Sequence, residues 1–231
     1  MIFYGVGVGP GDPDMVTISA KRTLDEADVV LVPVSSSGRV SLAGEIYSKL
    51  NPEKATHPFF FPMTEDASFR DEEILRQLDG YSALWKDASS VALPVIGDAA
   101  LYSTVAYLYA VWRSICPKLE LKLLPGISAH SMAGCRAGEF LVLGEERLAV
   151  LSGSADFSKL SETMAVSDCV ALYKPSALRE ELQELLSVTG PWKRAVRVHR
   201  VGLPEECVVT GGEALLPTDD YLSILLLWRA G

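Results

Sequence analysis

The feature that most constrains the fold is a series of alternating glycines in residues 2–17, IFYGVGVGPGDPDMVT. The apolar residues at its start are typical of a strand, and the glycines at positions 5, 7, 9 and 11 remove every second side chain. Another backbone or a ligand can therefore approach this segment closely. Pro10 and Pro13 stiffen the loop that follows, and Thr17 stands where the N-cap of a helix is expected. The segment predicts a strand, a tight loop and a helix, with the loop as a candidate binding element.

Common nucleotide-binding patterns do not fit this loop. A dinucleotide-binding fold needs glycines at i, i+2 and i+5, but counting from Gly5 or Gly7 puts Pro10 or Asp12 at the third position. A phosphate-binding P-loop needs Gly-Lys followed by Ser or Thr, and the loop has no such run. The common methyltransferase fold has an acidic residue two positions before the first glycine, where this chain has Phe3. For the glycines alone, a tight turn without a ligand is an equally good interpretation.

The size and charge of the chain limit its partners. It has 231 residues, 48% of them hydrophobic, and a formal net charge of −9 at pH 7. This length suits one large domain or two modest ones, and the acidity argues against nucleic acid as a partner. We also expect no membrane span, because the apolar stretches are too short, and no signal peptide, because the N-terminus has the pattern of a strand.

The cysteines indicate a reducing environment. Cys116, Cys135, Cys169 and Cys207 are far apart and form no Cys-x-x-Cys pair. We interpret them as reduced, mostly buried thiols of a cytoplasmic protein, and we expect no metal site.

Strand and helix patterns alternate along the first half of the chain. Residues 29–33, VVLVP, form a short apolar run of the kind found in buried parallel strands. Further strands are predicted at 57–61, 90–95 and 119–124. Helices are predicted at 18–27, 40–50, 66–88 with an interruption near Gly80, 101–116 and 127–136. This alternation predicts an α/β fold with a mostly parallel sheet and helices on both faces.

The second half also contains both strands and helices, but its pattern indicates more antiparallel strand pairs. Strands are predicted at 147–151, 168–173, 195–201, 206–210 and 222–228, and helices at 156–164 and 176–187. The boundary is expected between 138 and 146, where glycines and acidic residues follow a helix. We therefore expect two α/β domains, residues 1–140 and 141–231.

Four segments resemble, in this order, the motifs of the tetrapyrrole (corrin/porphyrin) methyltransferases, which use S-adenosylmethionine. They are GVGVGPGDPDMVT (5–17), IGDAALYST (96–104), LLPGISAHS (123–131) and ALYKPS (171–176). The resemblance covers nearly the whole chain. It implies two α/β domains with a cleft between them, a mostly parallel N-terminal sheet, a mixed C-terminal sheet and a homodimer. It also implies S-adenosylmethionine as the cofactor, which brings its own activated methyl group.

Within the family, the doubled opening GVGVGPG and the segment FPMTED (61–66) resemble one branch. That branch methylates precorrin-2 or cobalt-factor II at C(20) in cobalamin biosynthesis. Methylation of a precorrin at C(11) or C(17) stays open as an alternative. A non-catalytic tetrapyrrole-binding module that kept the fold is a second alternative.

The resemblance assigns cofactor contacts to residues in several motifs. They are Pro10 in the opening loop, Ile96, Gly97, Asp98, Leu101, Tyr102, Ser103 and Thr104 after the fourth strand, Ser128 and Ala129 after the fifth strand, and Tyr173 and Gly202 in the second half. The usual Gly-Asp-Pro reads Gly97-Asp98-Ala99 here, which we expect to loosen the loop without loss of binding. From the residues alone, a helix cap explains Asp98 and Ser103 better than cofactor binding does, and Ser128 is a natural cap for the helix that follows it.

Asp12 and Arg39 are the candidates for binding the substrate. Asp12 offers an acceptor to the pyrrole N–H groups, although an Asx turn explains it equally well. Arg39 offers a cation to the carboxylates that a precorrin carries, although a solvated surface position explains this arginine better from the sequence alone. We assign no catalytic residue: related uroporphyrinogen III enzymes tend to carry an acidic residue at the end of the second strand, where this chain has Pro33. His130 is best explained as a structural histidine.

Overall fold

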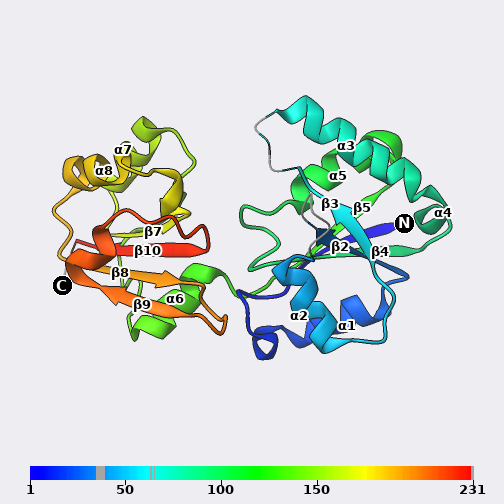
Figure 1. Ribbon diagram of the computed structural model, residues 1–231, viewed down its shortest axis with the longest axis horizontal. Coiled ribbons are helices and arrows are strands. Elements are labelled where there is room, and N and C mark those ends of the chain that lie inside the picture. The colour runs from blue at the N-terminus through cyan, green and yellow to red at the C-terminus, as the bar shows by residue number, and fades with distance from the viewer. Residues whose placement is uncertain (35–39, 63, 65, 230–231) are drawn as a thin grey trace. The chain divides into compact units, whose positions relative to one another are not determined.

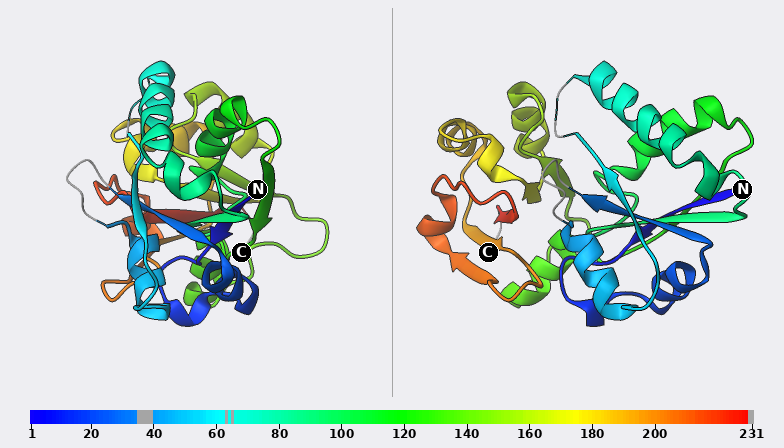
Figure 2. Two further views of the ribbon diagram at one scale, coloured as in Figure 1. Left: turned by 90° about the vertical axis from the view of Figure 1, so that its right-hand side faces the viewer. Right: turned by 45° about the vertical axis from the view of Figure 1, so that its right-hand side comes forward.

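The computed structural model describes residues 1–34, 40–62, 64 and 66–229 (Figure 1 and Figure 2). The chain divides into two compact units, Met1–Ser128 and Ala129–Gly231. Each unit has its own five-stranded sheet and its own hydrophobic core. Arg39 and positions 63 and 65 of the FPMTED segment lie outside the described residues.

The sheet of the first unit is parallel in every pair that the structure describes. Its strands lie in the order β3-β2-β4-β1-β5, which confirms the predicted parallel sheet. Because the strands run in one direction, the loops after their carboxyl ends gather at one edge of the sheet. The bounds are β1 (Ile2–Gly7), β2 (Val29–Val34), β3 (His57–Phe60), β4 (Ser90–Val95) and β5 (Glu120–Leu124).

Helices cover both faces of this sheet (Figure 1). Helices α1 and α2 pack on one face, and α3, α4 and α5 pack on the other. As predicted, Thr17 caps α1: its Oγ1 accepts a hydrogen bond from the Ala20 N at 3.1 Å. Ser41 and Asp66 cap α2 and α3 in the same way. The bounds are α1 (Ile18–Glu26), α2 (Leu42–Leu50), α3 (Ala67–Gly80), α4 (Ser82–Trp85) and α5 (Val105–Ile115).

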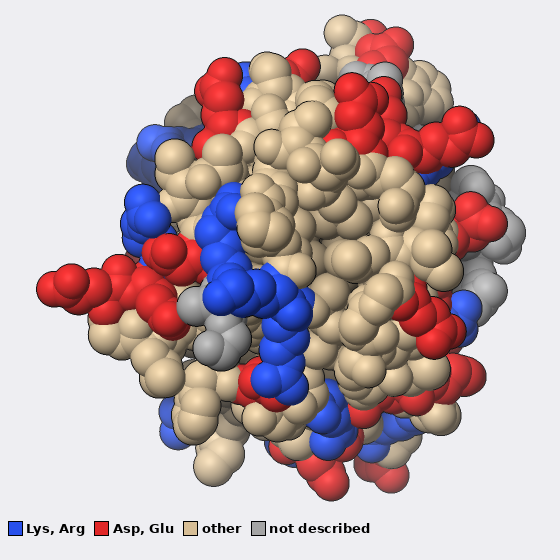
Figure 3. Space-filling view, turned by 90° about the vertical axis from the view of Figure 1, so that its left-hand side faces the viewer, with Lys and Arg blue, Asp and Glu red and all other residues tan. Residues whose placement is uncertain are grey.

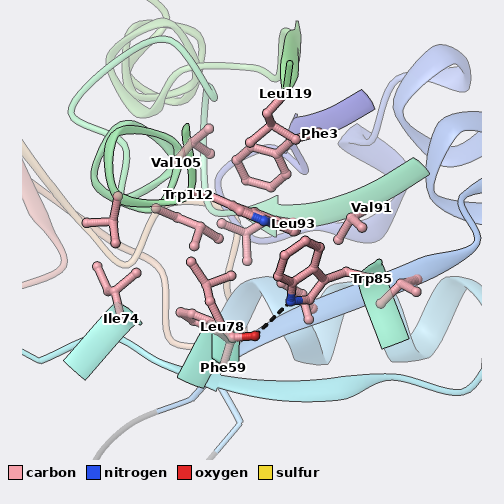
Figure 4. Close-up of a cluster of buried hydrophobic side chains, with 14 of the residues drawn as sticks. Phe3, Phe59, Ile74, Leu78, Trp85, Val91, Leu93, Val105, Trp112 and Leu119 are labelled. Carbon is pink, nitrogen blue, oxygen red and sulfur yellow. Dashed lines mark hydrogen bonds between the residues drawn. The ribbon is translucent and has the colours of Figure 1, made fainter. Parts of the chain in front are cut away.

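Aromatic side chains form the centre of the core under α3 and α5 (Figure 4). The Trp112 ring is fully buried and lies 5.3 Å from the Phe3 ring and 5.4 Å from the Trp85 ring, measured between centroids. The Trp85 Nε1 donates to the Leu78 O at 2.7 Å, which joins α4 to α3. Pairs of this kind stabilise a core beyond their buried area.

The sheet of the second unit is mixed, as predicted. Its strands lie in the order β6-β7-β10-β8-β9. Strand β10 runs antiparallel to both β7 and β8, and β6 runs parallel to β7. Helices α7 and α8 cover one face, and α6 contacts β10 and β8. The bounds are α6 (Ala129–Ala137), β6 (Leu148–Ser152), α7 (Phe157–Ala165), β7 (Cys169–Tyr173), α8 (Glu181–Thr189), β8 (Arg194–His199), β9 (Cys207–Thr210) and β10 (Ser223–Trp228).

The boundary between the units differs from the sequence-based expectation. It falls after Ser128 rather than between 140 and 141. The reason is that α6 packs against β10 and β8 of the second unit, and its Met132, Ala133 and Gly134 are buried. Local patterns could place this helix but not the sheet on which it packs.

Two expectations about local structure were wrong in detail. The helix predicted from residue 101 begins only at Val105, because Tyr102 has a φ of +49° and cannot continue a right-handed helix. The cysteines are not mostly buried: Cys169 is buried, Cys116 is half-buried, and Cys135 and Cys207 are exposed. Burial raises the pKa of the Cys169 thiol to about 12. In the part of the chain that the structure describes, no helix has the length and apolarity needed to cross a membrane.

Candidate functional site

Three loops of the first unit meet beyond the carboxyl ends of β1, β4 and β5. Gly9 and Gly97 form an antiparallel bridge, in which the Gly97 N donates to the Gly9 O at 2.7 Å and the Gly9 N to the Gly97 O at 3.2 Å. The Val8 N also donates to the Val95 O at 2.9 Å. Backbone hydrogen bonds thus continue from the parallel pair of β1 and β4 into an antiparallel bridge between their loops. The third loop packs against this bridge through Gly126.

This junction requires glycine at positions 7 and 126. A Cβ atom on Gly7 would lie 2.5 Å from the Gly126 N and 2.7 Å from the Gly97 O. A Cβ on Gly126 would lie 2.7 Å from the Gly7 C and would overlap the Gly97 O. Close-packed backbone cannot move aside without strain. We name Gly7, Gly9, Gly97 and Gly126 the glycine junction, because they join the three loops backbone to backbone.

The other side of Gly97 is open among the residues that the structure describes. Its φ is +71°, and a Cβ there would meet none of their atoms within 4 Å. In the same loop the side chains of Ile96 and Tyr102 are exposed, by 40% and 53% respectively. The loop therefore combines bare backbone with apolar and aromatic surface, which is the composition of a small-molecule site.

The polar residues of this loop have local partners. The Asp98 Oδ1 accepts from the Ala100 N at 2.7 Å, and the Ser103 Oγ accepts from the Val105 N at the start of α5 at 3.2 Å. The Leu101 N donates to the Asp98 O at 3.3 Å, and Thr104 occupies the N-cap position without a side-chain cap bond. These bonds support the interpretation of Asp98 and Ser103 as turn and cap residues. A carboxylate has further lone pairs, so Asp98 can still accept from a ligand.

The opening loop has the turn that its sequence suggests. Pro10 is buried, and the Asp12 Oδ1 accepts from the Asp14 N at 2.9 Å. Asp12 thereby caps a short 3₁₀ helix, Pro13–Met15. The Asx-turn interpretation of Asp12 is confirmed, and a binding role would use its remaining acceptor capacity.

In the second unit, Tyr173 ends β7 and Gly202 follows β8. The Tyr173 hydroxyl lies 2.9 Å from the His130 Nδ1 and accepts from the His130 N at 3.2 Å. Gly202 has a φ of +78°, and its N donates to the Glu206 Oε2 at 2.6 Å. The amide of Gly202 is therefore already engaged within the protein.

The structure brings together only some of the residues predicted to bind the cofactor and the substrate. The glycine junction joins the loops that carry Pro10, residues 96–104 and Ser128 in the first unit. Ala129, Tyr173 and Gly202 belong to the second unit, and Arg39 lies outside the described residues. Sequence reasoning missed the partnership of Gly7 with Gly126 and of Tyr173 with His130. The alternating glycines signalled a close approach but not its partner.

Charged groups also gather at the end of β8. The Asp220 carboxylate accepts from the Leu222 N at 3.0 Å and from the Arg200 Nε at 3.2 Å, and lies 3.4 Å from the His199 Nδ1. Burial raises the pKa of Asp220, but these hydrogen bonds and charges outweigh it and hold that pKa below its ordinary value.

On the face drawn in Figure 3, basic and acidic side chains both occur, so this face is not uniformly acidic.

Comparisons with known proteins agree on one family. The family model of tetrapyrrole (corrin/porphyrin) methylases matches residues 3–216. A probable cobalt-precorrin-2 C(20)-methyltransferase of Methanocaldococcus jannaschii is 30% identical over 98% of this chain and 95% of its own length. A precorrin-2 C(20)-methyltransferase of a Sinorhizobium species is 26% identical over 97% of this chain and 95% of its own length.

A solved structure shows the same fold. Uroporphyrin-III C-methyltransferase of Thermus thermophilus, complexed with S-adenosylhomocysteine, superposes with a TM-score of 0.71. The two chains are 19% identical, and the alignment covers 99% of this chain and 92% of the other.

Proposed function

Because the chain belongs to the tetrapyrrole (corrin/porphyrin) methylases, we propose that it methylates precorrin-2 or cobalt-factor II at C(20) in cobalamin biosynthesis. The names of the two relatives, which align over nearly their whole length, support this position on the ring. One relative is named for cobalt-precorrin-2 and the other for precorrin-2. The proposal therefore covers both substrates.

The glycine junction is the observation that carries the proposal. It places bare backbone and exposed apolar side chains at the carboxyl edge of a parallel sheet, where α/β folds bind their ligands. S-adenosylmethionine fits such a site, because its adenine and ribose need apolar surface, close backbone approach and a few polar acceptors. When bound, it supplies a methyl group already activated on a sulfonium.

The protein's own task is to position the two reactants. We propose that Gly97, Ile96 and Tyr102 contact the cofactor, with Asp98, Leu101, Ser103 and Thr104 supporting the same loop. Pro10, Ser128, Ala129 and Gly202 complete the proposed cofactor contacts, and Tyr173 belongs to the same proposed site. Transfer of a methyl group from sulfur to carbon is an in-line displacement, so alignment and exclusion of water supply most of the rate. Asp12 and Arg39 are the proposed substrate contacts.

The decisive experiment is a methylation assay with the purified protein and isotopically labelled S-adenosylmethionine. Precorrin-2 and cobalt-factor II would be offered side by side, and the new methyl group located by carbon NMR. We expect a methyl group at C(20) of at least one substrate. A methyl group at C(11) or C(17) would contradict the proposed position on the ring, while methyl transfer from S-adenosylmethionine to a tetrapyrrole would still hold. Cofactor binding without transfer would point to a different tetrapyrrole substrate, and failure to bind the cofactor would favour a non-catalytic module.

We also propose that the protein is a cytoplasmic homodimer. Four cysteines that all remain free thiols suit a reducing compartment. Light scattering after gel filtration is expected to give twice the chain mass of 25.0 kDa, and a monomer at micromolar concentration would contradict the dimer. Fractionation of the native cells tests the compartment, and recovery with membranes or in the medium would contradict it.

A further inference from the structure

Helix α6 connects the three residues of the second unit that the family resemblance assigns to the cofactor. It begins at Ala129, and its second residue, His130, bonds to the Tyr173 hydroxyl. Near its end, the Arg136 Nε lies 2.9 Å from a carboxylate oxygen of Glu206, the residue that accepts from the Gly202 N. One helix thus relates Ala129, Tyr173 and Gly202 to each other.

The contact between Tyr173 and His130 caps this helix from a different element. The N–H groups in the first turn of a helix have no partner within the helix. The Tyr173 hydroxyl, which comes from β7, accepts from the His130 N at 3.2 Å. It also lies 2.9 Å from the His130 Nδ1, and the two rings meet edge to face with centroids 6.0 Å apart. Two polar contacts and a ring contact therefore join one tyrosine to one residue of the first turn.

Tyr173 is itself held firmly. It pairs with Ser152 of β6 on one side and with Ile224 of β10 on the other. The Gly153 N donates to the Tyr173 O at 2.7 Å, and a Cβ at Gly153 would overlap the Lys174 O. The phenol therefore stands on an interior strand whose end is closely packed, so it can serve as a fixed reference for α6.

We propose that Tyr173 and His130 are positioning residues that hold the first turn of α6, and with it the Ser128–Ala129 segment, in the place required to bind S-adenosylmethionine. This inference rests on the proposed function. It gives Tyr173 a different role from the direct contact with the adenosyl group that the family resemblance implies. The tyrosine acts through His130 and the helix rather than on the cofactor.

The test measures the dissociation constant for S-adenosylmethionine by calorimetry in the full-length protein and in four single variants. Tyr173→Phe removes the hydroxyl, and His130→Leu removes the ring nitrogen. His130→Asn keeps a polar atom at the position of Nδ1. Tyr81→Phe is the matched control, because it removes a tyrosine hydroxyl that donates to the Pro58 O at 2.6 Å in the first unit, outside the proposed site.

We expect Tyr173→Phe to weaken binding about threefold to tenfold, the value of roughly one neutral hydrogen bond. His130→Leu should weaken binding in the same direction, while His130→Asn and Tyr81→Phe stay within about twofold of the unchanged protein. In the double variant Tyr173→Phe/His130→Leu, the loss of affinity should not exceed the product of the two single losses. If both residues act through one contact, the loss should be smaller than that product.

Three results would overturn the inference. Tyr173→Phe could bind as tightly as the unchanged protein, or Tyr81→Phe could weaken binding just as much. Alternatively, Tyr173→Phe could weaken binding while His130→Leu has no effect, which would indicate direct contact with the cofactor. If the unchanged protein itself fails to bind S-adenosylmethionine, the proposed function fails. If the unchanged protein binds but the variants give one of the three results above, only the inference fails.

Discussion

Replacement of Gly126 by alanine is expected to reduce methyl transfer by on the order of 100-fold, the loss that a displacement of about 1 Å can cause. The new Cβ would overlap the Gly97 O and lie 2.7 Å from the Gly7 C. Both neighbours are backbone atoms of loops that continue paired strands, so neither moves aside cheaply. The three loops must separate instead, and the open side of Gly97 then changes shape. Overpacking of this kind also costs about 1–3 kcal/mol of stability.

Gly80→Ala is the matched control for this variant. Gly80 ends α3, and a Cβ there would meet no atom of the described part of the chain within 4 Å. Alanine is favoured over glycine in a helix by up to about 1 kcal/mol, so this variant should be as active and as stable as the unchanged protein, or slightly more stable. Transfer rates and calorimetric binding of S-adenosylmethionine would be measured for both. Equal activity of the two variants would show that the glycine junction does not shape the site.

Replacement of Trp112 by alanine is expected to have the largest effect on stability, about 3–5 kcal/mol. The ring is fully buried and lies between Phe3 and Trp85, so its removal leaves a cavity bounded by rigid rings (Figure 4). The most protected backbone amides exchange their hydrogens only when much of the protein unfolds. The hydrogen-exchange rates of the amides in β1 and β4 should therefore rise about 100-fold or more. These rates are measured by mass spectrometry of peptides from the two strands.

The variant Trp112→Phe tests whether the destabilisation by Trp112→Ala comes from the lost aromatic volume or from the lost indole N–H. Among the described residues, the Trp112 Nε1 has no hydrogen-bond partner, so phenylalanine removes a buried N–H that stabilises nothing. We expect this variant to lose less than half as much stability as Trp112→Ala, because most of the aromatic contact with Phe3 remains. Equal losses of stability in Trp112→Phe and Trp112→Ala would contradict this expectation. Either the indole N–H then has a hydrogen-bond partner, or the full volume of the indole matters more than its contact with Phe3.

Much of the fold was predictable because its signals are local. The apolar run VVLVP became a parallel strand buried over most of its length, and Thr17 became the N-cap of α1. Alternation of strands and helices indicated the parallel sheet, since each element is recognisable from its own periodicity. Likewise, Asp12, Asp98 and Ser103 make the short-range turn and cap bonds that their side chains favour.

Other features were not predictable because they depend on distant partners. Tyr102 adopts a left-handed conformation within a segment whose apolar pattern indicates a helix. Helix α6 belongs to the second unit, although its sequence pattern carries no information about which sheet it covers. Cys135 and Cys207 are exposed, because the side of a helix or strand that faces solvent is decided by its neighbours.

The sequence by itself determined the elements, the parallel and mixed sheets, and the motifs that identify the family, because hydrophobic period, turn residues and caps act over a few positions. Only the tertiary structure decided that Gly7, Gly97 and Gly126 meet backbone to backbone and that Tyr173 caps α6 through His130. These contacts join residues far apart in the chain. Their energies arise from close packing and hydrogen bonding between elements, which no local pattern of residues records.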